Sequence, residues 1–376
     1  MIQMFSPVYD VDNCIKEIRD CLEKGWLGQG YKTTEFEEQW KCYTGLPNAH
    51  LLCTATAGLN LAVRIFKQQL GWKDDDEIIS TPLTFVATNN AVLINNMKVR
   101  FADVNNTLCL DPEDVKKKIN NKTKAVIFVG IGGNIGDYYE IVDICKQHDL
   151  ILILDAAHMA GTRVNGVIPG SEADAVVYSF HVTKNLSLAD AGMLCFKNSE
   201  YDSIVRKISW NGIDTTTSPA RFEKHYKWKM NITQVADAYN GNSIMAAIAI
   251  AQLPLLDREN QYRRKVASWY KRELREIEGI EFVSVPQKCV SSQWLYQIIV
   301  KEKRDDLMEY LQSNGIGCAL HYLDNTEYPM YEEQKGKCLK AHYYSEHLVS
   351  LPCHLKIKEE DVRYIVAKIK DYLRIK

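Results

Sequence analysis

The chain has 376 residues, of which 46% are hydrophobic and 25% charged, and its formal net charge is -2. Such a composition is that of a globular protein with room for one large and one smaller domain. The near-neutral charge and the lack of a long basic run exclude a typical nucleic-acid partner, and no apolar stretch is long enough to predict a membrane span. The first residues lack the pattern of a signal peptide, so we expect a cytoplasmic protein.

Hydrophobic spacing predicts alternating helices and strands through most of the chain. The predicted helices lie at Val11 to Glu23, from Thr33 onward, and at Leu59 to Gln68, Ala87 to Asn95, Pro112 to Lys118, Tyr139 to His148, Gln252 to Asp257, Gln261 to Ile277 and Glu359 to Leu373. The predicted strands lie at His50 to Cys53, Glu77 to Ile79, Lys98 to Phe101, Ala125 to Val129, Leu150 to Leu154, Ala175 to Ser179, Gly192 to Phe196 and Trp294 to Val300.

Continuous apolar strands that alternate with helices indicate an α/β fold, with a mostly parallel sheet covered by helices on both faces. From about Pro254 onward the rhythm changes to an α+β pattern. We therefore predict a large domain over residues 1–253 and a smaller α+β domain over residues 254–376.

The cysteine pattern argues against a metal ribbon and against a disulfide framework. The eleven cysteines are scattered from Cys14 to Cys353, and no two of them form a CxxC pair. An odd number without close pairs is typical of reduced thiols in a cytoplasmic protein. We expect no bound metal.

Asp155 and Lys184 each follow an apolar strand, where functional residues of parallel sheets collect. A carboxylate in the position of Asp155 either caps a following helix or pairs with a buried cation such as a protonated pyridine nitrogen. Lys184 is either a solvated loop residue or a desolvated amine with a lowered pKa, which is a usable nucleophile. His158 lies close enough in sequence to Asp155 to share its site.

Two further segments after strands add to this pair. The small residues Thr54 to Gly58 open a helix, whose N-terminus favours a phosphate. Phe85, in the segment Pro82 to Thr88, is either a core residue or an aromatic ring that stacks on a flat heteroaromatic ligand. A phosphate site, a stacking ring, a carboxylate and a lysine are together the set that pyridoxal phosphate requires.

The sequence resembles the DegT/DnrJ/StrS aminotransferases, which transfer an amino group to keto sugars carried on nucleotides. The resemblance is carried by DEIISTPLTFVATNNAVL, LILDAAHMAG, YSFHVTKNLS, IMAAIAIAQLPLLD and GIGCALHY, and it spans nearly the whole chain. It implies a type I aminotransferase fold with a mostly parallel seven-stranded sheet. It also implies a homodimer whose two active sites lie at the subunit interface.

Matched positions carry the family's roles onto this chain. Lys184 would form the Schiff base and shuttle protons, Asp155 would hold the pyridine nitrogen, and His158 would lie beside the ring hydroxyl. The implied cofactor contacts are Thr56, Ala57, Phe85, Asp155, His158, Ser179, Lys184 and Asn240, the last reaching the phosphate from the other subunit. The acceptor pocket would be lined by Trp26, Tyr31, His321 and Tyr322.

The chain departs from the family pattern near the substrate. Ala189-Asp190-Ala191-Gly192 replaces a glycine-rich ending, and Val129 to Ile135 lacks a histidine and a proline that are common there. Ala238 replaces the residue that usually reaches the partner's phosphate, so Asn240 or Asn242 would substitute, and His342 stands where a glutamate is common. These changes leave the expected cofactor residues intact and affect the expected substrate contacts.

We therefore predict an aminotransferase that uses pyridoxal phosphate, takes the amino group from L-glutamate and gives it to a nucleotide-linked keto-6-deoxy sugar. A smaller phosphorylated ketone or aldehyde is the alternative acceptor, which the altered loops favour. A 3-dehydratase of the same fold would have histidine in place of Lys184. A regulator that has lost catalysis is the non-enzymatic alternative, against which the complete set of Lys184, Asp155 and Phe85 speaks.

Overall fold

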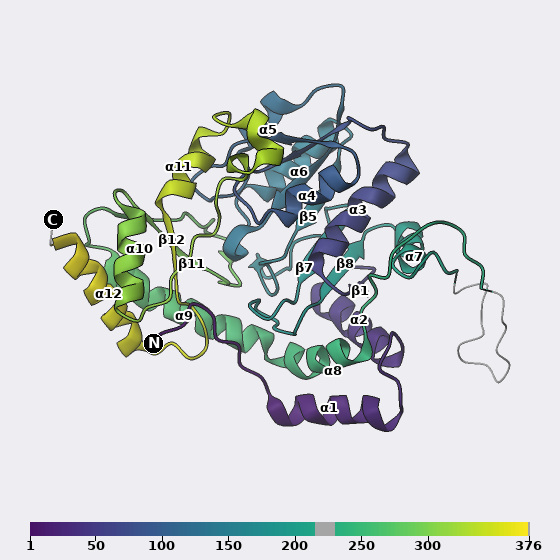
Figure 1. Ribbon diagram of the computed structural model, residues 1–376, viewed down its shortest axis with the longest axis horizontal. Coiled ribbons are helices and arrows are strands. Elements are labelled where there is room, and N and C mark those ends of the chain that lie inside the picture. The colour runs from purple at the N-terminus through teal and green to yellow at the C-terminus, as the bar shows by residue number, and fades with distance from the viewer. Residues whose placement is uncertain (215–229, 375–376) are drawn as a thin grey trace.

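Twelve helices and twelve strands are described in a computed structural model that covers residues 1–214 and 230–374 (Figure 1). The helices are α1 Val11–Glu23, α2 Tyr31–Thr44, α3 Ala55–Leu70, α4 Ala87–Ile94, α5 Pro112–Lys118, α6 Tyr138–Gln147, α7 Ser199–Ile208, α8 Ser243–Gln252, α9 Leu256–Leu274, α10 Arg304–Ser313, α11 Leu339–His347 and α12 Glu359–Arg374. The strands are β1 His50–Leu52, β2 Glu77–Ser80, β3 Lys98–Phe101, β4 Thr123–Val129, β5 Ile151–Asp155, β6 Arg163–Val164, β7 Ala175–Ser179, β8 Gly192–Phe196, β9 Ile280–Phe282, β10 Cys289–Val290, β11 Tyr296–Val300 and β12 Leu348–Leu351.

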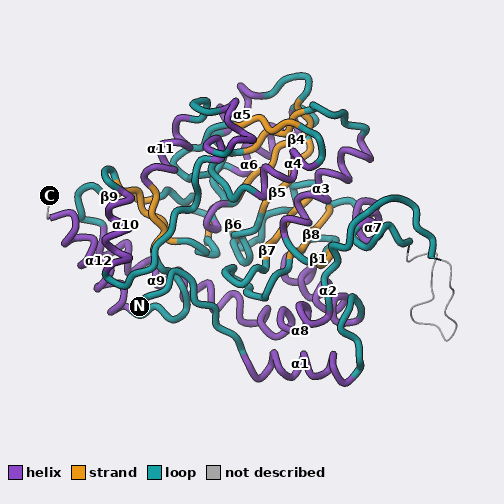
Figure 2. Tube along the Cα trace, in the orientation of Figure 1, coloured by secondary structure: helices purple, strands orange, loops and turns teal. Residues whose placement is uncertain are grey.

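A seven-stranded sheet with the order β1-β8-β7-β5-β4-β2-β3 forms the centre of the molecule (Figure 2). The strands β7, β5, β4, β2 and β3 are mutually parallel, while β8 runs antiparallel to both of its neighbours. The strands of this sheet are almost continuously buried, as expected where helices flank the sheet. The predicted α/β fold with a mostly parallel seven-stranded sheet is confirmed.

Register in the sheet brings strand ends together at one edge. Asp155, the last residue of β5, pairs with Val129 at the end of β4 and with Val177 in β7. Because β1 and β7 are both antiparallel to β8, the carboxyl end of β1 lies on the same edge. This edge is where parallel sheets place their ligands.

A second, antiparallel sheet of the order β12-β11-β9 packs with α9, α10 and α12 (Figure 1). Its residues form a separate hydrophobic cluster that includes Val266, Tyr270, Ile298 and Val366. The N-terminus joins this part of the molecule, since Ile2 pairs with Ile316. A division into domains at residue 254 stays a prediction.

Some boundaries differ from those predicted. Helix α3 begins at Ala55 rather than at Leu59, because the Thr54 hydroxyl accepts a hydrogen bond from Ala57 N and caps the helix there. Helix α2 begins at Tyr31, so Thr33 lies inside its first turn and bonds back to the backbone of Gly30. The helical material expected from Gln252 onward is divided at Pro254, where a 3-10 turn links α8 to α9. Within the described parts of the chain, every helix is too short or too polar to cross a bilayer.

Candidate active site

A cavity of about 390 Å³ lies at the carboxyl edge of the large sheet. Segments that follow β1, β2, β4, β5 and β7 converge on it, together with Phe5 from the N-terminal segment. Its lining includes Thr56, Phe85, Asp155, His158, Ser179, Lys184, Trp294, His321 and Tyr322. Eight of these nine residues were predicted site residues, and the ninth, Trp294, was not. Phe5 is a second lining residue outside the predicted set.

Asp155 is buried at the end of β5, with 4% of its surface exposed. Its Oδ2 accepts a hydrogen bond of 2.7 Å from the Thr88 hydroxyl, and its Oδ1 accepts one of 3.1 Å from Ala157 N. The helix-cap interpretation is wrong, because residues 156–162 form turns and no helix follows β5 directly. Burial raises the pKa of Asp155, while these two hydrogen bonds and the charge of Lys184 oppose the rise.

Lys184 lies on the loop that connects β7 to β8, and it lines the same cavity as Asp155. Its Nζ lies 3.5 Å from the centroid of the Trp294 ring. Burial lowers the pKa of Lys184 to about 7, although the charge of Asp155 acts in the opposite direction. The interpretation as a solvated loop charge is wrong, and the amine has the proton affinity of a group that can both accept and donate a proton near neutral pH.

The loop that carries Lys184 is held by side chains from distant segments. The amide of Asn185 donates to Asn260 Oδ1 at 2.6 Å and to the carbonyl of Ser292 at 2.8 Å. The hydroxyl of Ser187 donates to the carbonyl of Lys184 at 2.6 Å. These bonds hold the carbonyl of Lys184 and the residue that follows it, so the position of the lysine depends on distant segments as well as on its own loop.

His158 has partners at both ring nitrogens. Its Nδ1 accepts a hydrogen bond of 3.2 Å from Gly132 N, which leaves the proton of the neutral ring on Nε2. Nε2 lies 3.1 Å from the Tyr322 hydroxyl, to which it donates. Burial lowers the pKa of His158, and the charge of Lys184 lowers it further, so the ring is neutral. Its expected place beside the cofactor's ring hydroxyl stays a prediction.

The N-terminus of α3 provides the expected phosphate end of the cavity. Thr56 and Ser179 line the cavity there, whereas Ala57 does not, and Ala57 N already donates to the capping Thr54 hydroxyl at 3.1 Å. β8 approaches α3 closely, because a Cβ at Gly192 would lie 2.4 Å from Ala55 N. This close approach explains why glycine occupies the end of the divergent segment Ala189 to Gly192.

Phe85 lies at the mouth of the cavity rather than in the core. Its side chain is 56% exposed, and its ring centroid is 5.9 Å from that of Tyr322 at an angle of 49°. The interpretation of Phe85 as a core residue is therefore wrong. Phe85 lines the cavity, where an aromatic ring can stack on a flat ligand.

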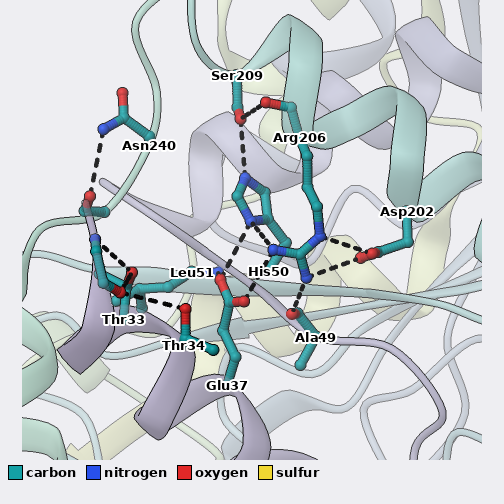
Figure 3. A network of polar contacts seen from close by, with 12 residues as sticks. Thr33, Thr34, Glu37, Ala49, His50, Leu51, Asp202, Arg206, Ser209 and Asn240 are labelled. Carbon is teal, nitrogen blue, oxygen red and sulfur yellow. Dashed lines mark hydrogen bonds and ion pairs between the residues drawn. The ribbon is translucent and has the colours of Figure 1, made fainter. Parts of the chain in front are cut away.

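Besides Ala57, three more predicted site residues lie outside the cavity of their own chain. The indole of Trp26 donates to the carbonyl of Gln29 at 2.9 Å, and the hydroxyl of Tyr31 bonds to Asp20 at 2.8 Å. The amide of Asn240 donates to the carbonyl of Gly241 at 3.3 Å (Figure 3). Of the four predicted substrate contacts, the structure brings only His321 and Tyr322 to the cavity.

Two further groups were missed by reasoning from the sequence. Thr88 holds Asp155, but its hydroxyl is one of two in the segment Pro82 to Thr88, and nothing in the pattern distinguishes it from that of Thr84. Trp294 was included in a predicted strand, yet β11 begins at Tyr296 and the indole faces Lys184 and His158. A tryptophan after Ser291 and Ser292, directly before an apolar run, was the available signal.

The segment Gly130 to Ile135, which is expected to depart from the family pattern, contains tightly packed glycines. A Cβ at Gly130 would lie 2.0 Å from Met159 Sδ, and a Cβ at Gly133 would lie 2.2 Å from Ser292 Oγ. Gly132 has a φ of 62°, which favours glycine, and its N–H is the group that bonds to His158. This loop therefore binds His158 Nδ1 through the N–H of Gly132 and fixes the orientation of the ring.

A buried carboxyl with a raised pKa, an amine with a lowered pKa, and a helix N-terminus on one cavity fit pyridoxal phosphate. The fold and the site together define a type I aminotransferase that depends on this cofactor. The sequence matches the DegT/DnrJ/EryC1/StrS aminotransferase family over residues 9–370, and the chain belongs to this family.

Relatives and solved structures resemble the chain along nearly its whole length. It is 30% identical to the GDP-perosamine synthase of Vibrio cholerae, with 99% of each chain covered. It is 29% identical to the UDP-4-amino-4,6-dideoxy-N-acetyl-β-L-altrosamine transaminase of a Campylobacter jejuni strain, with 95% of this chain and 92% of the relative covered.

Two solved aminotransferases have the same fold. PseC of Helicobacter pylori, an aminotransferase in the biosynthesis of pseudoaminic acid, superposes with a TM-score of 0.92 at 25% identity, covering 100% of both chains. The putative sugar aminotransferase Spr1654 of Streptococcus pneumoniae, in its pyridoxamine phosphate (PMP) form, superposes with a TM-score of 0.89 at 26% identity, covering 98% of both chains. A pyridoxal phosphate (PLP) form of Spr1654 also superposes, which agrees with the cofactor of this family.

Proposed function

We propose that the protein transfers an amino group from L-glutamate to the keto carbon of a nucleotide-linked keto-6-deoxy sugar. The observation that carries this proposal is that Asp155 and Lys184 line one cavity in a chain similar throughout to a UDP-sugar transaminase and to a GDP-perosamine synthase. The names of these relatives support a nucleotide sugar as the acceptor.

Pyridoxal phosphate, when bound, carries the amino group between the two substrates and stabilises negative charge on the carbon that exchanges a proton. Lys184 would bond to the cofactor and, when free, move the proton, for which a pKa of about 7 is suited. Asp155 would hold the ring nitrogen, and Thr88 would hold Asp155 in place. Thr56 and Ser179 would bind the phosphate and Phe85 would cover the ring.

We further propose that the protein acts as a homodimer in which each subunit completes the other's cavity. Trp26, Tyr31 and Asn240 lie outside the cavity of their own chain, which is the arrangement expected of residues that serve a neighbouring copy. The proposal assigns Asn240 to the phosphate of the other subunit and the two aromatic residues to the acceptor.

A smaller phosphorylated ketone or aldehyde is the second candidate acceptor. It is favoured by the packed glycine loop from Gly130 to Gly133, where the sequence is expected to depart from the family pattern on the substrate side. The names of the relatives favour the nucleotide sugar, so we rank the smaller acceptor second.

The test follows the cofactor rather than the product. Glutamate is used to convert the bound cofactor to its amine form, and the return of the original absorbance is recorded after each acceptor is added. The acceptors are UDP- and GDP-linked 4-keto- and 3-keto-6-deoxy sugars and small phosphorylated ketones and aldehydes. We expect rapid return with a nucleotide sugar and none in Lys184→Ala. Return with small acceptors only would overturn the sugar assignment.

A further inference from the structure

Trp294 connects three segments of the active site. Its backbone N–H donates to the carbonyl of Gly132 at 3.1 Å, and its indole Nε1 donates to the carbonyl of Thr183 at 2.7 Å. The side chain is buried, with 5% of its surface exposed. Trp294 is therefore fixed at both ends, to the glycine loop and to the residue that directly precedes Lys184.

The indole ring has the Lys184 amine and the His158 ring as close neighbours. Lys184 Nζ lies 3.5 Å from the indole centroid, and the His158 ring stacks at 3.8 Å with an interplanar angle of 24°. Phe5 stacks on the indole at 5.7 Å and His321 meets it edge-on at 5.4 Å. Indole is the side chain that attracts an ammonium ion over its face most strongly.

No hydrogen bond joins Lys184 Nζ to any residue in 1–214 or 230–374, whereas the backbone of Lys184 bonds to His181 and Ser187. A buried amine without a hydrogen bond is normally costly, so the face of Trp294 is the feature that compensates the protonated amine.

We propose that Trp294 is a positioning residue that holds the Lys184 amine whenever this amine is not bonded to the cofactor. The inference rests on the proposed role of Lys184 and extends it to the free state of the lysine, which every transamination passes through. In that state the indole keeps the ammonium inside the cavity and raises its affinity for a proton against the effect of burial.

Other groups also act on the amine. The titratable side chains that line the same cavity are Asp155, His158, His181, Asp190, His321 and Tyr322. Asp155 raises the pKa of Lys184, and burial lowers it to about 7. Burial also lowers the pKa of His158, and that of His321 to about 4, so these two rings are neutral and do not compete with the ammonium for the indole.

The test measures how fast the cofactor-free protein captures pyridoxal phosphate as a function of pH. Capture requires the neutral amine, so the midpoint of the rate against pH reports the proton affinity of Lys184. Wild type is compared with Trp294→Phe and Trp294→Leu. The matched control is Trp72→Phe, an indole that packs on Phe66 at 6.1 Å outside the cavity lining. All variants receive the same cofactor solution, and the formation of the absorbance band is recorded.

Loss of the indole face removes a favourable interaction with the ammonium, so the midpoint should fall by about one pH unit in Trp294→Leu. The midpoint of Trp294→Phe should lie between those of wild type and Trp294→Leu, because phenyl attracts a cation less than indole does. The midpoint of Trp72→Phe should match that of wild type. If Trp294 merely excluded water, its removal would hydrate the amine and move the midpoint upward. A midpoint that rises, or one that does not change in either Trp294 variant, would overturn the proposal. If Trp294→Leu does not fold, the midpoint of Trp294→Phe decides.

The outcome is separable from the proposed function. If Lys184→Ala forms the same absorbance band as wild type, the assignment of Lys184 fails, whatever Trp294 does. If the midpoints shift as expected but no keto sugar restores the cofactor from its amine form, the acceptor assignment fails and the role of Trp294 stands.

Discussion

Burial acts on three side chains of the site in the directions that acid–base chemistry near neutral pH requires. It raises the pKa of Asp155, lowers that of Lys184 to about 7, and lowers that of His158 so that the ring stays neutral. Neighbouring side chains oppose or reinforce each of these pKa shifts, so the effect of a substitution of such a neighbour on the pKa can be predicted in sign.

The first prediction concerns Thr88, whose hydroxyl donates to Asp155 Oδ2 at 2.7 Å. This bond stabilises the ionised carboxylate, so Thr88→Val should raise the pKa of Asp155 further. A hydrogen bond to a charged group contributes about 1.5–3 kcal/mol, equivalent to a rise of about one to two pH units. The acidic limb of kcat/KM should therefore move to higher pH, as measured by initial rates across pH.

Thr88→Ser is the matched control for this prediction, because it keeps the hydroxyl and should leave the acidic limb in place. Thr84→Val removes a hydroxyl that bonds to Thr88 at 3.1 Å but does not bond to Asp155. Its effect should be smaller than that of Thr88→Val. An unchanged acidic limb in Thr88→Val would show that this hydroxyl does not control Asp155.

At the scale of elements, a buried polar network joins α2, β1 and α7 (Figure 3). Glu37 lies between His50, at 3.2 Å, and Arg206, at 2.9 Å, and His50 also bonds to Ser209 at 2.8 Å. The carbonyl of Ser209 in turn accepts bonds from the N–H groups of Tyr239 and Asn240. The network therefore holds the segment that carries Asn240 beside β1.

The second prediction is that Glu37→Gln lowers the free energy of unfolding by about 2 kcal/mol at pH 7, because a charged hydrogen-bonded group is lost. The loss is limited because Arg206 still forms its ion pair with Asp202 and remains partly exposed to water. Burial alone would raise the pKa of Glu37, but His50 and Arg206 outweigh it and lower the pKa. A lowered pKa stabilises the folded state above the unfolded pKa, and this stabilisation is lost as the pH falls through the folded pKa.

Urea unfolding at pH 7 and at about pH 3.5 checks this prediction, and the difference between wild type and Glu37→Gln should shrink at the lower pH. Glu38→Gln is the control, since Glu38 is exposed and forms an ion pair with Lys41 at the surface. A difference that stays constant with pH would contradict the assignment of the stabilisation to the ionised Glu37.

The third prediction concerns the contact between β8 and the start of α3. Gly192→Ala places a Cβ about 2.4 Å from Ala55 N, and backbone at both positions cannot move aside cheaply. Overpacking of this kind costs about 1–3 kcal/mol. Because α3 forms the proposed phosphate site, the affinity for pyridoxal phosphate should fall roughly tenfold, as measured by titration of the cofactor-free protein.

Gly28→Ala is the matched control, because a Cβ at Gly28 meets no atom within 4 Å and the residue does not have a positive φ. It should leave cofactor affinity and thermal stability unchanged. If Gly192→Ala binds the cofactor as wild type does, the approach of β8 does not shape the phosphate site.

The elements of the large sheet were predictable because buried parallel strands are apolar without interruption. Ala175–Ser179 and Gly192–Phe196 have the predicted bounds. β9, β10 and β12 were not predicted, since they are short, and β9 and β10 carry exposed or half-exposed residues that give no continuous apolar pattern. Asp155 and Lys184 were found because each follows an apolar strand, whereas Thr88 and Trp294 act through contacts that only the tertiary structure creates.

At the scale of the whole molecule, two hydrophobic clusters share helix α9 as their link. The larger cluster surrounds the seven-stranded sheet and includes Leu256, while the smaller one includes Val266 and Tyr270 from the same helix. The cavity lies between groups from both parts, since Lys184 comes from the large sheet and Trp294 and His321 come from beyond α9. The sequence pattern predicts that there are two parts. It does not predict the cavity between them, because that cavity is formed by side chains far apart in the sequence.

The last prediction tests whether two copies of the chain share their sites. Lys184→Ala and Asn240→Ala are purified separately, then unfolded and refolded as an equal mixture. If Asn240 serves the partner's cavity, each mixed dimer contains one cavity with both residues intact and one that lacks both. Half of the dimers are mixed and each has one intact site, so the mixture should recover about a quarter of wild-type activity.

Refolded Lys184→Ala alone should have no activity, and the mean activity of the two proteins refolded separately is the baseline that the mixture has to exceed. Sedimentation analysis of each protein verifies that both substitutions leave the dimer intact, so that a lack of recovery is not caused by dissociation. Activity of the mixture at or below the mean of the two separate proteins would mean that Asn240 serves its own chain or no site at all. Recovery above that mean is possible only if residues from two chains meet in one cavity, because neither chain alone carries both side chains.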